Sequence, residues 1–111
     1  MLRCARMASA RRKLGLMLST APDHPNLETA LGLSRAALDG DTDVYLYLID
    51  DAVASVEDDR LQALAGRGLK LFVCAYGCQK RRRPLSEHAT NCGLVVLTDV
   101  INGTDRFVAL N

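Results

Sequence analysis

The stretch Leu69–Pro84, LKLFVCAYGCQKRRRP, decides how this sequence folds. Its first half is a mainly apolar run bounded by turn signals, a pattern typical of a strand that is buried on both faces. Tyr76 and Gly77 end that run, Cys78 follows at once, and the cationic segment Lys80–Arg83 comes next. A buried strand followed by a glycine and a polar segment indicates the turn from a strand into a helix in an α/β protein. The pattern therefore predicts that Cys78 lies where a strand ends and a helix begins.

That position suits a reactive thiol. The free N–H groups and the positive end of a helix dipole stabilise a thiolate, and neighbouring cations lower the pKa of the thiol further. We therefore expect Cys78 to be a partly exposed nucleophile with a lowered pKa. The cations Lys80, Arg81 and Arg82 would then activate Cys78 or bind an acidic partner; the alternative is that they form a solvated helix face.

The composition is that of one compact domain. The chain has 111 residues, of which 49% are hydrophobic and 24% are charged, and it contains no apolar run of the roughly 18 residues that a membrane span requires. The net charge of +1 and the 5% of aromatic residues argue against a nucleic-acid partner. Four cysteines without a recognisable secretory signal favour a reducing compartment, so we expect a cytoplasmic protein.

The remainder of the chain alternates strand and helix signals. Apolar runs predict a first strand at Leu14–Thr20 and a second at Asp43–Ile49, and helical spacing predicts a helix over Asn26–Leu38. A second helix is predicted through Arg60 and Ala65, ending near Gly66 or Gly68. A third helix is predicted after Cys78, interrupted or started by Pro84 and running to about Ala89. A fourth strand is predicted at Gly93–Leu97 and a fifth at Arg106–Leu110. The direction of the last strand stays open.

This order predicts an α/β fold: a single domain with a mainly parallel five-stranded sheet and helices on both faces, as in flavodoxin-like proteins. Ligands of such sheets bind beyond the carboxyl ends of the strands, at the point where the strand order reverses. For a sheet order 2-1-3-4 that point lies between the first and third strands, so His24 and Cys78 are predicted to lie near each other. The predicted site has Cys78 as the catalytic residue, with support or ligand binding from His24, Asp50, Tyr76, Gly77, Lys80, Arg81 and Arg82.

The other cysteines have plainer interpretations. Cys74 is expected to be a core residue or a resolving thiol for Cys78, and Cys92 to be structural. A zinc set of Cys74, Cys78, His88 and Cys92 lacks the tight spacing of a zinc knuckle, so we expect no metal. Phosphate-binding glycine loops are absent from the sequence, and we expect no cofactor.

The first residues form a separate segment. Residues 1–12 are predicted to be a flexible basic arm that precedes a domain spanning residues 13–111. Residues 1–13 carry five basic side chains and no acidic one, MLRCARMASARRK. A frayed leader, a nucleic-acid arm and a targeting segment all remain open.

The sequence from Lys13 to Asn111 resembles the DsrE/DsrF-like (YchN-like) family of small sulfur-relay proteins. The resemblance rests on the series KLGLMLST, PNLETALGLSRAAL, DVYLYLIDDAV and LQALAGRGLKLFVCAYGCQKRRRPL, and it is sharpest at the third strand and the turn after it. There, Gly68 precedes the strand, Cys78 stands at the turn and Arg81–Arg83 follow. The chain departs from the family pattern in that its inner cysteine lies four residues before Cys78, and in that Pro84 stands where a glycine is common.

The resemblance implies a function. Members with an active cysteine accept sulfur as a persulfide and pass it to a partner, and relatives assemble as trimers, hexamers or mixed complexes. We therefore expect a sulfur carrier or sulfurtransferase-like protein with the persulfide on Cys78, donor and acceptor proteins as partners, and a trimer or hexamer. The alternative is a non-catalytic oligomeric α/β module that binds a small ligand or a protein in the same crevice. A carrier requires an exposed Cys78, whereas a binding module tolerates a buried one.

Overall fold

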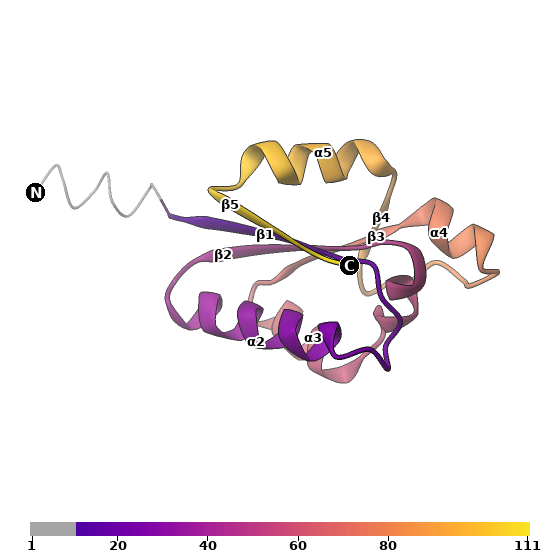
Figure 1. Ribbon diagram of the computed structural model, residues 1–111, viewed down its shortest axis with the longest axis horizontal. Coiled ribbons are helices and arrows are strands. Elements are labelled where there is room, and N and C mark those ends of the chain that lie inside the picture. The colour runs from indigo at the N-terminus through magenta and orange to yellow at the C-terminus, as the bar shows by residue number, and fades with distance from the viewer. Residues whose placement is uncertain (1–10) are drawn as a thin grey trace, which may run out of the picture.

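Five parallel strands form the sheet in the computed structural model, which describes residues 11–111 (Figure 1). Their bounds are β1 Lys13–Leu18, β2 Asp43–Leu48, β3 Lys70–Cys74, β4 Thr90–Cys92 and β5 Arg106–Leu110. The spatial order is β4-β3-β2-β1-β5, and each neighbouring pair is parallel. The predicted α/β fold is confirmed. The last strand, whose direction the sequence left undecided, runs parallel to β1.

Helices cover both faces, as predicted. α2 (Asn26–Asp39) and α3 (Asp59–Gly66) lie on one face, whereas α5 (Leu94–Gly103) lies alone on the other (Figure 1). The strands β1 to β4 are added one after another in one direction across the sheet, and β5 is then added on the other side of β1. Because crossovers between parallel strands are right-handed, this reversal of direction places α5 on the opposite face from α2 and α3. The short helix α4 (Ala75–Lys80) and the 3₁₀ helix η1 (Asp50–Ser55) lie at the carboxyl ends of the strands.

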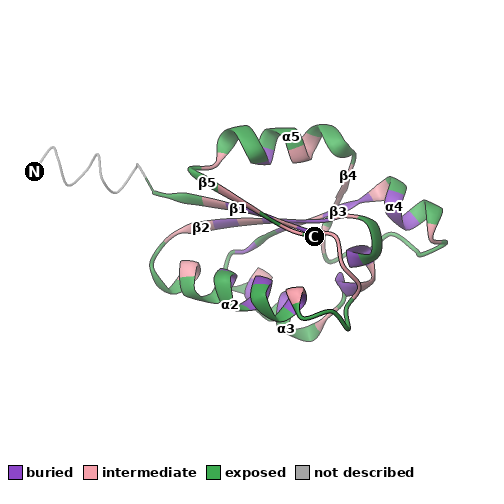
Figure 2. Ribbon diagram, viewed as in Figure 1, coloured by how far each residue is buried: buried purple, intermediate pink, exposed green. Residues whose placement is uncertain are grey.

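The core lies between the sheet and the α2 and α3 layer. The inner strands are buried almost throughout, whereas most of α5 is exposed (Figure 2). Leu16, Leu46 and Leu48 are fully buried, and Leu31 and Leu61 pack on them from the two helices. The periodicity of the apolar residues in α2 thus identified its buried face correctly.

Glycines mark the ends of α2 and α3, and an aspartate caps the start of α3. Gly40 ends α2, and α3 ends at Gly66, as the sequence indicates. At the start of α3, Asp58 itself is the N-cap, and its carboxylate accepts the backbone N–H of Arg60 at 2.9 Å. This cap satisfies one of the N–H groups that the first turn of a helix leaves free.

The predicted strand at Gly93–Leu97 is wrong. Those residues begin α5, and β4 is the preceding segment, Thr90–Cys92. The run of leucine and valine has strand propensity, but β5 is parallel to its neighbour β1, and a parallel connection needs a crossover of about a dozen residues. A helix over Leu94–Gly103 supplies that crossover, so the topology overrides the local preference.

Two further expectations are corrected. The helix expected after Cys78 is α4, which begins earlier and ends at Lys80, and the segment Pro84–Ala89 is irregular; Arg82 adopts a positive φ of 54°, and the residue before a proline is disfavoured in a helix. The order 2-1-3-4 is also wrong, since β2 stands between β1 and β3. The reversal of strand order therefore falls between β1 and β5.

The predicted basic arm, residues 1–12, lies outside the described residues apart from Arg11 and Arg12. β1 begins at Lys13, where the predicted domain begins. Within residues 11–111, no helix is long and apolar enough to cross a membrane.

Candidate functional site

Three free thiols gather where β3 and β4 end. Cys74 is the last residue of β3, and Cys92, the last residue of β4, is its partner in the parallel register. Cys78 follows one helical turn later in α4. Cys74 and Cys78 are buried, and Cys92 is half-buried.

The structure contradicts the expected exposure of Cys78. The residue is only 1% exposed and belongs to the hydrophobic core. Burial raises the pKa of its thiol, and the neighbouring Cys74 adds to the rise, while Arg83 and Arg81 partly oppose it. The physical reason is that α4 begins at Ala75, so Cys78 lies inside the helix and not at its start.

Cys74 occupies the helix-start position that the sequence assigned to Cys78. It is the N-cap of α4, and its Sγ accepts the backbone N–H of Gly77 at 3.3 Å. Gly77 also lets α4 pack closely on η1, since a Cβ there would lie 3.2 Å from Cγ1 of Val53 and require that side chain to shift. The strand-to-helix turn was therefore predicted correctly, but it was placed three residues too late.

Tyr47 is a residue of this site that the sequence analysis missed. Its hydroxyl donates to the carbonyl of Gly93 at 2.9 Å. The pKa of Tyr47 lies far above its usual range, mainly because the ring is buried and secondarily because Cys92 and Cys74 lie close to its hydroxyl. The alternation in DVYLYL places Tyr47 on one face of β2, but the neighbouring thiols could not be foreseen without the β3–β4 pairing.

A cationic groove opens at the same edge of the sheet, and no cysteine is among the described residues that line it. It has a volume of about 300 Å³ and lies between the loops that follow β1, β2 and β3. Pro22, Asp51, Arg81 and Arg83 line it, together with Ala21 and Ala54. Arg81 Nε donates to Asp51 Oδ1 at 3.0 Å, whereas Arg83 is exposed and makes no ion pair with the described residues.

The other predicted site residues are dispersed. His24 is exposed in the loop after β1, and its Nδ1 accepts the backbone N–H of Asn26 at 3.0 Å. No hydrogen bond or ion pair joins His24 to the buried Cys78 among the described residues, and the strand order from which their proximity was predicted is wrong, so that proximity stays a prediction. Asp50 is exposed at the start of η1 with a positive φ of 54°.

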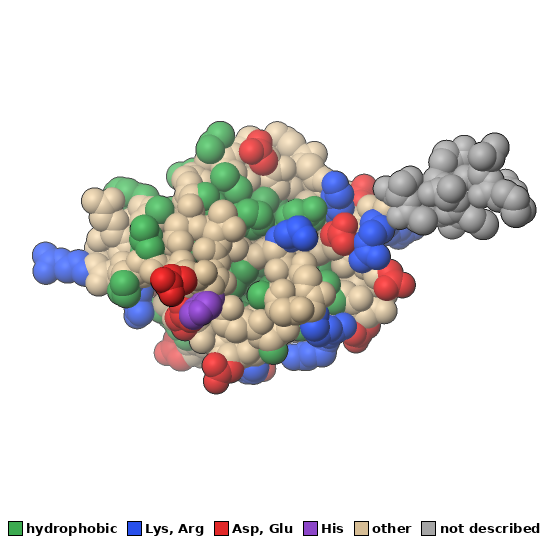
Figure 3. Space-filling model, turned by 180° about the vertical axis from the view of Figure 1, so that it is seen from behind, with side chains coloured by type: hydrophobic (Ala, Val, Ile, Leu, Met, Phe, Trp, Pro, Cys, Tyr) green, Lys and Arg blue, Asp and Glu red, His purple; other side chains and the backbone are tan. Residues whose placement is uncertain are grey.

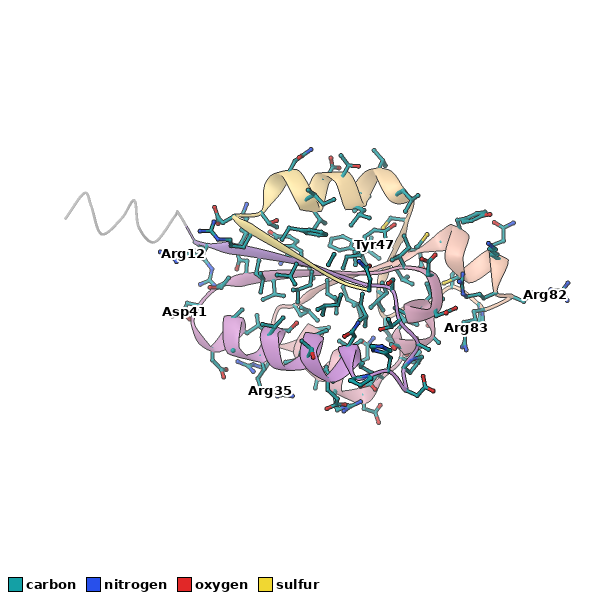
Figure 4. The ribbon with its side chains drawn as sticks, in the orientation of Figure 1. Arg12, Arg35, Asp41, Tyr47, Arg82 and Arg83 are labelled. Carbon is teal, nitrogen blue, oxygen red and sulfur yellow. The ribbon has the colours of Figure 1, made fainter. Side chains whose placement is uncertain are left out.

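Three predicted residues of the α4 region lie on its outer surface. Tyr76 is 66% exposed, and Lys80 is exposed. Arg82 extends away from the body of the molecule, and Arg83 lies closer to it (Figure 4). Of the three arginines after the thiol, only Arg81 and Arg83 reach the groove.

His88 joins a separate polar cluster. Its Nδ1 lies 2.9 Å from Glu57 Oε1, and Ser86 Oγ donates to the other oxygen of that carboxylate. In the described residues, no three histidine, cysteine or acidic side chains are arranged to hold a metal ion. The cluster instead ties the loop before β4 to the start of α3.

The fold and the thiols together define a parallel α/β protein with a cysteine cluster and a cationic groove at the carboxyl edge of its sheet. The structure is similar to that of the YchN protein from E. coli, with a TM-score of 0.73 and 17% identity over 90% of this chain and 99% of that one. It is also similar to BT1422, a conserved protein of unknown function from Bacteroides thetaiotaomicron, with a TM-score of 0.71 and 13% identity over 94% of this chain and 98% of that one.

These likenesses confirm the fold that the family resemblance implied. No family model matches the chain, and no curated protein matches its sequence. At such low identity the shared architecture carries no information on the role of individual cysteines.

Proposed function

We propose that the protein accepts a sulfur atom as a persulfide on the thiol pair Cys74 and Cys78 and passes it to a partner. The observation that carries this proposal is the pair of neighbouring thiols, Cys74 and Cys78, where β3 ends, with the cations Arg83 and Arg81 near Cys78. Parallel α/β proteins bind their ligands beyond the carboxyl ends of the strands, which is the edge where these thiols lie, although at β3 and β4 and not at the reversal between β1 and β5. The fold shared with YchN and the family resemblance of the sequence are consistent with it.

The transfer needs no external oxidant. A thiolate attacks the outer sulfur of a donor persulfide, RS–SH, forming the new S–S bond while the donor leaves as RS⁻; transfer to the acceptor repeats the step. The N–H of Gly77, which already donates to Cys74 Sγ, stabilises negative charge on that sulfur. Of the two thiols, Cys74 accepts the N–H of Gly77, and Cys78 has the cations Arg83 and Arg81 close by.

This proposal requires that a sulfur donor can reach Cys74 or Cys78. Cys74 is 2% exposed and Cys78 is 1% exposed, so α4 or the irregular segment after it has to move before a donor can reach either sulfur. Segments with few buried apolar contacts open most easily. Pro84 and Leu85 in that segment are exposed, which favours opening there.

The same burial favours a second candidate function, a non-catalytic module that binds a small anionic ligand. In this case Arg81 and Arg83 hold the ligand in the 300 Å³ groove, and the cysteines contribute only packing. Arginine is well suited to such a role because its planar fork pairs with oxyanions.

One experiment separates the two candidates. The purified protein is incubated with a low-molecular-weight persulfide donor, and the peptides are mapped by mass spectrometry for an added sulfur. We expect the added sulfur in the wild type, a nearly complete loss of it in Cys74→Ser and a smaller loss in Cys78→Ser. Cys92→Ser is the matched control and retains loading.

The outcomes assign the role. Loss only in Cys78→Ser would make Cys78 the carrier, as the sequence predicted. If no cysteine of the folded protein gains sulfur, or if only Cys92 does, sulfur carriage on this pair is wrong and the binding module stands.

We further propose that the protein works as a homo-oligomer, a trimer or hexamer, in the cytoplasm. Exposed apolar residues of α5 support the assembly, since Leu94 is 54% exposed and Val95 is 72% exposed. The three free thiols of the described domain fit a reducing compartment.

A further inference from the structure

A second concentration of positive charge lies at the opposite edge of the sheet, where the parallel strands begin. An open groove of about 810 Å³ lies there between the first residues of β1 and β5 and the last residues of α2 and α5. Arg11, Arg12, Lys13 and Arg106 line it, against the single carboxylate of Asp105. Blue side chains gather at this end of the molecule, beside the grey segment (Figure 3).

Two of the nearby carboxylates are already engaged. Asp43 Oδ1 accepts from Arg11 Nε at 2.9 Å, and Asp105 Oδ2 accepts the backbone N–H of Lys13 at 2.8 Å. The side chains of Arg12 and Lys13 make no ion pair with the residues that the structure describes. The groove therefore keeps an excess of positive charge that the domain itself does not neutralise.

Two cations are held in place by contacts that leave part of their donor capacity free. Arg11 contacts Asp43 through Nε, and Arg106 donates from Nη1 to the backbone carbonyl of Asp105 at 2.9 Å. A guanidinium has five N–H donors in a rigid fork, so each arginine retains donors for a second oxyanion. Like charges this close repel one another, and a bound polyanion would relieve that repulsion.

We propose that this groove binds a polyphosphate chain, either as free tripolyphosphate or as the phosphates of a nucleotide. The volume lies within the range of small-molecule sites, and several cations at short spacing match a chain of linked phosphates. None of the described residues that line the groove is aromatic, so there is no platform on which a base could stack. The phosphates therefore carry the recognition, and a nucleoside alone does not bind.

The test is isothermal titration calorimetry of the full chain with tripolyphosphate, ATP, adenosine and a ten-nucleotide single-stranded DNA. Tripolyphosphate and ATP should bind with similar dissociation constants, adenosine should not bind, and raising the salt from 50 to 200 mM should weaken binding several-fold. The double variant Arg12→Gln/Lys13→Gln should weaken tripolyphosphate binding about tenfold or more, because it removes two charge-assisted contacts.

Arg35→Gln is the matched control, because Arg35 is an exposed cation on α2 that does not line the groove. It should bind tripolyphosphate like the wild type. Thermal melts of all variants establish that they fold. The proposal is overturned if tripolyphosphate does not bind at 1 mM, if Arg35→Gln and the double variant lose equal affinity, or if ATP binds only through its adenosine. Binding of the oligonucleotide more tightly than tripolyphosphate would also overturn it and make the groove a nucleic-acid site.

Discussion

At the scale of single residues, the three thiols differ in how far solvent can reach them. Cys78 is 1% exposed, Cys74 is 2% exposed and Cys92 is only half-buried. Burial raises the pKa of both Cys78 and Cys92, so little thiolate of either is present at neutral pH. Reactivity in the folded state should therefore follow access.

The rate of alkylation tests this. With iodoacetamide at neutral pH, we expect Cys92 to react faster than Cys78, and raising the pH should accelerate both reactions because more thiolate forms. Peptide mapping after partial labelling gives the order, and labelling in urea gives the rates without burial. If Cys78 is labelled first under native conditions, α4 opens readily and the thiol is accessible after all.

Glu57 provides a pH-dependent contact at the same scale. Hydrogen bonds from Ser86 and then from His88 lower the pKa of Glu57 below its ordinary value of 4.5. A lowered pKa in the folded state means that the stabilisation is present at neutral pH and is lost as the pH falls through the folded pKa.

We therefore expect Glu57→Gln to lower the free energy of unfolding more at pH 7 than at pH 3. Urea unfolding at the two pH values measures this difference. Glu87→Gln is the control, because Glu87 is exposed and makes no hydrogen bond or ion pair with the described residues. An equal effect of Glu57→Gln at both pH values would show that the carboxylate contributes no net charge-dependent stability.

At the scale of elements, α5 and β1 pack through a glycine. A Cβ at Gly15 would lie 2.8 Å from Thr104 Oγ1 and 3.0 Å from both Phe107 Cδ1 and Val100 Cγ1. Such distances are too short for real carbon contacts, so a side chain at Gly15 would push α5 off the sheet.

We expect Gly15→Ala to lower the free energy of unfolding by about 1–3 kcal/mol through overpacking. The matched control is Gly32→Ala in the middle of α2, where no atom lies within 4 Å of the new methyl group. That control should raise the free energy of unfolding by about 0.5–1 kcal/mol, since alanine is the better helix former. Denaturant unfolding measures both, and a neutral Gly15→Ala would mean that α5 shifts without cost.

The elements that the sequence predicted well are those whose patterns are local. Apolar runs located β1, β2, β3 and β5, and helical spacing located α2 and α3. The segment Gly93–Leu97 could not be assigned that way, because its helical state depends on a crossover between strands that are distant in sequence.

The candidate site was predicted in outline only. The strand-to-helix turn was found, but a shift of three residues in the start of α4 placed Cys74 at the turn and Cys78 in the core. Pairing of Cys92 with Cys74 depends on the register of β3 and β4, and the short edge strand β4 has no clear pattern of its own. Sequence periodicity does not report such side-by-side placement.

At the scale of the whole molecule, the two faces of the sheet are covered unequally. α2 and α3 cover one face, whereas α5 alone covers the other (Figure 1). α5 exposes the apolar side chains Leu94, Val95 and Ile101 beside the polar residues Thr98, Asp99 and Asn102, while Val100 is buried. Three large apolar side chains exposed on the one helix of this face favour contact with another copy of the chain.

We therefore expect an oligomer at micromolar concentration, and Val95→Glu should convert it to a monomer without unfolding it. Val95 is 72% exposed, so a charge there costs little in the isolated chain but is expensive in a dry interface. Leu33→Glu is the control, because Leu33 is an exposed apolar residue of α2 on the opposite face. Size-exclusion chromatography with light scattering gives the masses, and circular dichroism checks the fold. A monomeric wild type would remove the proposed assembly, and dissociation by Leu33→Glu alone would move the interface to the α2 face.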